Sequence, residues 1–186
     1  MQRIDTAIPG VLELRPAVFQ DPRGFFIETY HRDRFRSIGI VDEFVQDNHS
    51  RSVKNTLRGL HYQLHRGQAK LCRVIEGQAF DVAVDIRVGS PTFGQSVSLT
   101  LCAETHNMIY IPAGFAHGFV ALTDSVQFLY KCSDFYDSSD EHGIVWNDPA
   151  LNIPWGVDAP LVSGKDAKLP RLADVARDLL PRYRAS

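Results

Sequence analysis

Cysteine is scarce in this sequence. Only three cysteines occur among 186 residues, and none belongs to a Cys-x-x-Cys pair. Cys72, Cys102 and Cys132 each lie in an apolar stretch, where a thiol behaves mainly as a small hydrophobic group. This pattern argues against a disulfide framework.

Long apolar runs and clusters of one charge sign are also missing. The apolar stretches are far shorter than a membrane span, and the first five residues lack the apolar region of a signal peptide. The formal net charge is −2, and no run of Lys or Arg occurs. We therefore expect a cytoplasmic protein that binds neither membranes nor nucleic acid.

Helical periodicity is weak, whereas turn signals such as Pro9-Gly10 and Glu76-Gly77 are frequent. Only residues 171–180 and, more briefly, 32–38 show a helical pattern. Between the turns, β-favouring segments predict strands at residues 11–14, 25–30, 71–75, 80–88, 97–101, 108–111, 118–122 and 126–130.

These patterns predict a mainly β protein built as a double-sheet jelly-roll barrel, with short peripheral helices and a C-terminal helix. The length suits a single domain over residues 1–186. Its core should cover about residues 8–170, and residues 171–186 should form a helical tail.

Residues 80–88 illustrate how a strand face could carry chemistry. Alternation places Asp81 with Ala79 and Ala83 on one face and apolar residues on the other. If the first face lined a barrel interior, the alanines would leave space for a ligand and Asp81 would supply a charge. A solvent-facing strand is equally compatible with the pattern.

His61 is a candidate base in a second strand segment. Alternation places His61 and Gln63 on one face and Arg58 on the other, so Arg58 must reach a ligand from a bend, which Gly59 could make. Pattern alone also allows a structural or surface histidine. Likewise, Lys70 could be a solvated surface lysine and Tyr130 a packed core aromatic.

A metal site is not expected. Residues 112–117 resemble the second half of the cupin metal-binding signature, which would place His117 towards a barrel interior. Zinc or iron needs about three converging ligands, and the spacing of His61 and His65 does not suit a strand site. Lys70 stands where a carboxylate would be needed.

The chain resembles the dTDP-4-dehydrorhamnose 3,5-epimerase family, whose fold is the double-stranded β-helix, or cupin-type jelly-roll barrel. The resemblance extends from residue 8 to residue 166 and departs from the family pattern at Ala69 and at residues 155–157. The segments that carry it are residues 21–28, 44–50, 57–63, 81–87, 111–119, 128–131, 136, 140–144 and 163–166.

The resemblance implies a catalytic set of four residues. His61 would remove protons, Asp166 would orient it, Tyr130 would be the acid on the opposite side, and Lys70 would lie beside the ketone oxygen. It further implies that the nucleotide sugar is bound by Arg23, Glu28, Gln46, Asp47, Asn48, Arg58, Lys70, His117, Tyr136, Glu141 and Lys165.

The implied activity is a cofactor-independent isomerisation in dTDP-L-rhamnose biosynthesis. A dTDP-linked 4-keto-6-deoxy sugar, dTDP-4-dehydro-6-deoxy-D-glucose, would be converted to dTDP-4-dehydro-β-L-rhamnose by inversion at C5 and C3 through an enolate. The resemblance also implies a homodimer in which Arg23 and Glu28 complete the neighbouring subunit's site.

Three alternatives remain open at this point. A related enzyme could invert one carbon only, a metal-dependent cupin could use His117 as a ligand, and a non-catalytic protein could bind the sugar nucleotide without converting it.

Overall fold

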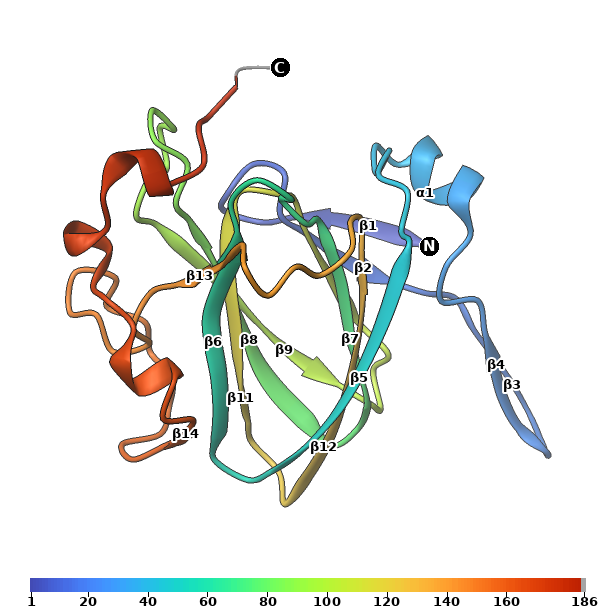
Figure 1. The fold of residues 1–186 in the computed structure, drawn as a ribbon. Helices are drawn as coiled ribbons and strands as arrows, with labels where there is room; N and C mark the ends of the chain where they lie inside the picture. The colour runs from blue at the N-terminus through green and yellow to red at the C-terminus, as the bar shows by residue number, and fades with distance from the viewer. Residues whose placement is uncertain (185–186) are drawn as a thin grey trace.

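The computed structural model describes residues 1–184 as a mainly antiparallel β structure (Figure 1). The strands are β1 Gln2–Asp5, β2 Leu12–Arg15, β3 Val18–Asp21, β4 Gly24–Ile27, β5 Gln46–Val53, β6 Thr56–Gln63, β7 Lys70–Glu76, β8 Gln78–Asp85, β9 Ser96–Cys102, β10 Met108–Ile111, β11 Phe115–Ala121, β12 Ser125–Cys132, β13 Glu141–Gly143 and β14 Leu161–Val162. The helices are α1 Arg32–Ser37 and the 3₁₀ turns Asp166–Lys168, Leu172–Asp174 and Arg177–Leu179.

Two six-stranded sheets form the body of the molecule. The first sheet has the order β1-β2-β10-β7-β12-β5. The second has the order β13-β6-β11-β8-β9, and β14 pairs in parallel with β6. A separate hairpin of β3 and β4 extends away from both sheets (Figure 1).

The main core lies between the two sheets. Every second residue of β8 faces inward, so Ala79 and Ala83 pack with Val74 and Phe128 of the first sheet. The aromatic rings of Phe119 and Phe128 stack with their centroids 4.1 Å apart. Two apolar inner faces thus hold the sheets together.

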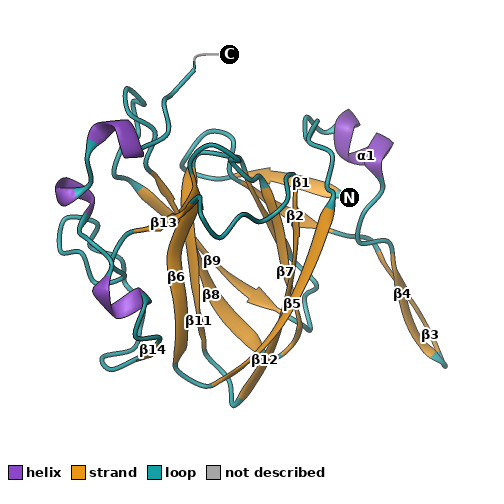
Figure 2. Ribbon diagram, viewed as in Figure 1, coloured by secondary structure: helices purple, strands orange, loops and turns teal. Residues whose placement is uncertain are grey.

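The outer faces are covered by peripheral segments, where the helices lie (Figure 2). On the second sheet, Val82 and Val84 of β8 pack under Trp155 and Leu180 of the C-terminal part. On the first sheet, a smaller cluster includes Phe35 of α1. Among residues 1–184, no helix is sufficiently long and apolar to cross a bilayer.

Each of the eight expected strands overlaps an observed one, and α1 confirms the short helix expected near residues 32–38. A closed barrel is wrong, because within the described residues the two sheets do not join. β5 and β6 belong to different sheets and diverge from their shared turn (Figure 1). The cleft described below opens between them, and pairing of these strands would fill it.

The expected C-terminal helix is also wrong for residues 171–180, which form two 3₁₀ turns; residues 185–186 lie outside the described part. An isolated ten-residue helix bounded by prolines is only marginally stable, because helix nucleation is costly. The segment follows the second sheet instead: Leu172 N–H donates to Asp148 at 2.8 Å, and the Tyr62 hydroxyl donates to the Leu179 carbonyl at 2.9 Å.

Candidate active site

A cleft of about 570 Å³ opens between the two sheets. Its walls come from β5, β7 and β12 of the first sheet and from β6 and β11 of the second. Ten of the predicted site residues line it: Gln46, Asn48, Arg58, His61, Lys70, His117, Tyr130, Tyr136, Glu141 and Asp166.

His61 and Asp166 form a hydrogen-bonded pair, with His61 Nε2 2.8 Å from Asp166 Oδ1. The imidazole is 29% exposed on the cleft wall, whereas the carboxylate behind it is only 6% exposed. Asp166 Oδ2 accepts a second hydrogen bond from the Gly59 N–H, at 3.2 Å. The carboxylate therefore fixes the orientation of the ring, which lines the cleft from β6.

Asp166 is held in its ionised form. Burial opposes ionisation, but the hydrogen bond and charge attraction of His61, with the bonds from Gly59 and Ser163, outweigh burial and lower the pKa of the carboxyl. An ionised carboxylate beside the imidazole stabilises the imidazolium that forms when His61 accepts a proton.

A bulge in β6 brings Arg58 and His61 to the same cleft. His61 pairs with His117 of β11, but Arg58 pairs with Phe119, so two residues of β6, Gly59 and Leu60, lie opposite the single residue Gly118 of β11. Gly59 supplies the bend with φ of +129°. The expected bend at Gly59, which turns Arg58 to the same side as His61, is thereby confirmed. Arg58 Nε donates a hydrogen bond to the Ser52 hydroxyl at 3.1 Å.

Tyr130 and Lys70 line the cleft from the first sheet, facing the wall that carries His61. Burial, followed by nearby Cys132 and Cys72, raises the pKa of Tyr130 to about 12. The phenol therefore keeps its proton at neutral pH. Lys70 adds a cation two residues from Cys72, which pairs with Tyr130 between β7 and β12.

The rim of the cleft carries a second polar group. The Tyr136 hydroxyl donates to Glu141 at 2.6 Å, and Lys165 is bonded to the same carboxylate. Burial raises the pKa of Glu141, but the bonds from Lys165 and Tyr136 outweigh it and leave the pKa lowered. Gln46 accepts from the Tyr136 N–H at 2.9 Å and so ties the rim to β5.

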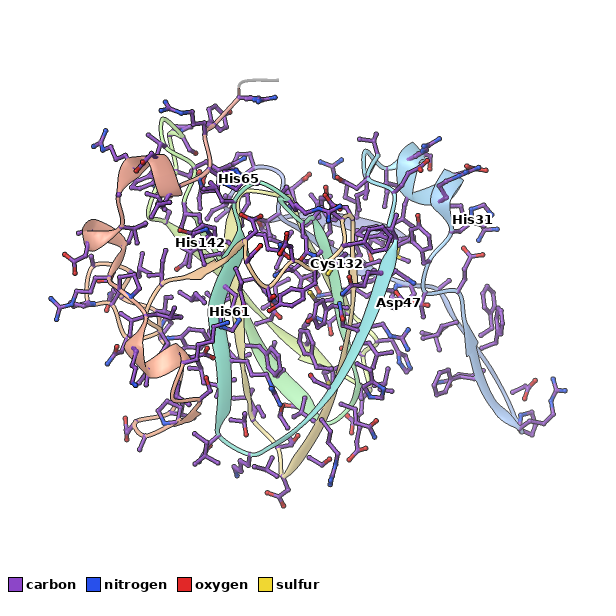
Figure 3. The ribbon with its side chains drawn as sticks, in the orientation of Figure 1. His31, Asp47, His61, His65, Cys132 and His142 are labelled. Atoms are coloured by element: carbon purple, nitrogen blue, oxygen red, sulfur yellow. The ribbon has the colours of Figure 1, made fainter. Side chains whose placement is uncertain are left out.

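Three predicted binding residues lie away from this cleft. Arg23, at the tip of the β3–β4 hairpin, is 90% exposed and pairs with Asp21, and Glu28 pairs with Arg34. Asp47 is 72% exposed and forms an ion pair with Lys131 on the outer side of β5 (Figure 3). Within one chain, these side chains do not join the others.

Comparison with known proteins places this arrangement in a family. Residues 5–174 match the family model described as dTDP-4-dehydrorhamnose 3,5-epimerase. The chain belongs to this epimerase family. A relative of that name from Pseudomonas aeruginosa is 52% identical over 176 residues, which cover 94% of this chain and 97% of the relative.

A solved structure of the epimerase family gives the same result in three dimensions. The dTDP-6-deoxy-D-glucose-3,5-epimerase from Legionella pneumophila, in complex with dTDP-4-keto-L-rhamnose, has a TM-score of 0.97 and 46% identity, with 99% of each chain covered. A dTDP-4-dehydrorhamnose 3-epimerase from Streptomyces niveus is 42% identical, covering 95% of this chain and 86% of that protein.

Sequence reasoning missed two residues of this epimerase-family cleft and one contact behind its wall. His117 Nε2 lies 2.8 Å from Asp81 Oδ2, and Asp81 is fully buried. Of the two interpretations of the β8 face that carries Asp81, the interior one is right as to burial, but Ala79 and Ala83 pack in the core and do not leave space for a ligand. Cys132, labelled in Figure 3, and His49 also line the cleft. Cys132 ends an apolar run and His49 belongs to a polar edge strand, so neither sequence pattern indicated a site.

Proposed function

We propose that this chain converts dTDP-4-dehydro-6-deoxy-D-glucose to dTDP-4-dehydro-β-L-rhamnose. The observation that carries the proposal is the placement of His61 and Tyr130 on facing walls of one cleft. Inversion beside a ketone needs a base on one face of the sugar and an acid on the other. The family membership and the relatives' names support this choice of substrate.

In the proposed reaction, His61 takes the proton from C5, and the electron pair of that C–H bond delocalises onto the C4 ketone oxygen. Asp166 stabilises the imidazolium, and Lys70 stabilises the enolate oxygen. A positioned donor of this type is worth roughly 3 kcal/mol of the barrier. Because only protons move, the reaction needs neither a redox cofactor nor a metal.

Tyr130 then gives its proton to the opposite face of C5, which inverts the centre. His61 releases its proton to water, and Tyr130 is reprotonated before the same sequence occurs at C3. The pKa of about 12 keeps Tyr130 protonated until the carbanion is present.

The nucleotide would be bound by the cationic side of the cleft. We propose that Arg58, His117 and Lys165 contact the diphosphate and sugar, because charge-assisted hydrogen bonds to phosphate are strong. Tyr136, which is 52% exposed at the rim, would stack on thymine. Gln46, Asp47, Asn48 and Glu141 would complete the subsite.

Proton exchange in D₂O tests this function directly. Proton NMR of the wild-type reaction should show deuterium entering at C5 and C3. His61→Asn should abolish exchange at both carbons, while His31→Asn, a histidine on the surface beside α1, should leave the rate unchanged. Near-normal exchange in His61→Asn would show that another group is the base.

A single inversion is the second candidate, because the Streptomyces niveus relative is named a 3-epimerase. Such an enzyme would use the same His61, Asp166 and Tyr130. Deuterium at C3 alone, with a product that keeps the D configuration at C5, would identify this activity.

We also propose a homodimer with shared sites. Phe19, Phe25 and Phe26 of the β3–β4 hairpin are 63%, 58% and 68% exposed, which is unusual for large apolar side chains. Arg23 and Glu28 lie on or beside this hairpin, so docking on a second copy would bring them to its cleft.

Mixing two inactive variants tests the shared site. Arg23→Ala and His61→Asn should each be inactive alone, but a refolded mixture should regain activity, because one cleft of the mixed dimer is then fully wild type. Light scattering should show a dimer. A monomer, or a mixture without activity, would rule out site sharing.

For the fold, we propose that the two sheets are an open form of the cupin-type jelly roll and that the described chain is one domain. The inward-facing core shared by both sheets supports the proposal. A single cooperative unfolding transition, identical by near- and far-ultraviolet circular dichroism, is the expected result.

A further inference from the structure

Three potential metal ligands converge behind the cleft wall: His117 lines the cleft, whereas Cys72 and Asp81 are fully buried next to it. Cys72 comes from β7 of the first sheet, and Asp81 and His117 come from β8 and β11 of the second. One donor atom from each residue lies within 4.8 Å of the other two. The Cys72 Sγ to His117 Nε2 distance is 3.9 Å, and His117 Nε2 to Asp81 Oδ2 is 2.8 Å.

An unsatisfied polar atom marks the same place. Asp81 is fully buried, and its Oδ1 atom has no hydrogen-bond partner among residues 1–184. A buried carboxylate oxygen without a partner is costly, since it has lost its hydration without replacement. The carboxylate thus has coordination capacity that its contact with His117 leaves unused.

We propose that Cys72, Asp81 and His117 bind one thiophilic divalent cation such as Zn²⁺. Zn²⁺ bonds of about 2.0–2.3 Å to S, N and O imply donor separations of roughly 3.2–3.8 Å in a tetrahedral site. The Cys72–His117 and His117–Asp81 separations lie within about half an ångström of this range. The Cys72 and Asp81 donors, within 4.8 Å of each other, would move closer together on binding. A water on the cleft side would be the fourth ligand. On binding, the Cys72 thiol proton leaves for solvent, and the proton that His117 Nε2 shares with Asp81 is lost to solvent while His117 keeps a proton on Nδ1.

The ligand set favours a reversible regulatory ion. A thiolate and a carboxylate neutralise the charge of the ion, but Lys70, two residues before Cys72, repels it. Bound metal occupies His117, which also lines the cleft. We infer that the ion competes with the nucleotide sugar for His117, an inference that rests on the proposed function.

Cobalt spectroscopy of the full-length protein tests binding without reference to catalysis. Chelator-treated protein, kept reduced with a phosphine, is titrated with Co²⁺. We expect a thiolate-to-Co²⁺ charge-transfer band that saturates at one equivalent and disappears when Zn²⁺ is added. Cys72→Val and Asp81→Asn should lose the band.

Cys102→Ser is the matched control, because it removes a buried thiol of β9 outside the cleft and should keep the band. If Cys72→Val does not fold, Cys72→Ser preserves the side-chain volume and still removes the thiolate. No band in the wild type, or an unchanged band without the Cys72 thiol, would overturn the site.

Inhibition is measured by deuterium exchange in the same proteins. At about ten times its dissociation constant, a competitive ion lowers the free enzyme about tenfold. Zn²⁺ should do so in the wild type and in Cys102→Ser, with recovery on chelation, but not in Cys72→Val. Binding without inhibition would overturn the competition, whereas absence of exchange in untreated wild type would refute only the proposed function.

Discussion

Asp166 connects the candidate base to the backbone, because its two oxygens accept from His61 and from the Gly59 N–H. Its contribution to stability depends on pH in a defined direction. The folded pKa lies below the ordinary 3.8, so the stabilisation is complete above that value and is lost as the pH falls through the folded pKa.

Asp166→Asn should therefore lower the free energy of unfolding at pH 7 and have a much smaller effect well below pH 3.8. Urea unfolding of both proteins across this range measures the difference. Asp158→Asn, at an exposed position, is the control and should show no such trend. A destabilisation that is equal at both ends of the range would contradict the ionised-carboxylate role.

Tyr130 gives a kinetic prediction at the same scale. Tyr130→Phe should lower net inversion by about 10²–10⁴-fold, because a positioned general acid is worth that much. Abstraction by His61 needs no phenol, so deuterium exchange with retained configuration should continue. Tyr30→Phe, outside the cleft, should change neither rate. Equal loss of exchange and inversion would mean that Tyr130 acts before the carbanion forms.

Among the elements, β6 depends most on a single residue. A Cβ on Gly59 would lie 2.6 Å from Gly118 Cα, and the φ of +129° is itself unfavourable for other residues. Gly89 has a φ of +90° but open space around it, so Gly89→Ala introduces backbone strain alone.

Gly59→Ala should therefore destabilise the protein by about 1–3 kcal/mol more than Gly89→Ala, the cost of overpacking. It should also reduce proton exchange, because the bulge places both Arg58 and His61. Denaturant unfolding and the D₂O assay measure the two effects. Equal destabilisation by the two substitutions would show that β6 and β11 move apart at Gly118 and accommodate the added methyl group without cost.

The elements also show where sequence reasoning works. Alternation predicted β8 and the grouping of Asp81 with Ala79 and Ala83, but it left open whether that face lies inside or in solvent. Both faces of the strand are in fact buried, one between the sheets and one under the C-terminal part. β5 was not predicted from the sequence, because it is an edge strand whose cleft-facing residues are polar: Gln46, Asn48 and Ser50. The Gly59 bend was predictable from Arg58 and His61, whereas the Asp81–His117 contact depends on how separate strands pair.

For the whole molecule, the C-terminal segment is part of the core although it is not an α-helix. Leu180 is 4% exposed and packs on the second sheet, while its neighbour Leu179 is 42% exposed. Leu180→Ala should cost about 2–5 kcal/mol of unfolding free energy. Leu179→Ala should stay within about 0.5 kcal/mol. Similar losses at both positions would mean that the segment packs differently in solution.

The placement of the cleft residues predicts the order in which they become accessible to solvent. His61, Lys70, His117 and Tyr130 belong to hydrogen-bonded strands, so their amides should exchange with deuterium only on global unfolding. Asp166 begins a short 3₁₀ turn after β14 and can detach through local opening. On warming, the protein should thus lose the orientation of its base while the strands of the cleft remain folded.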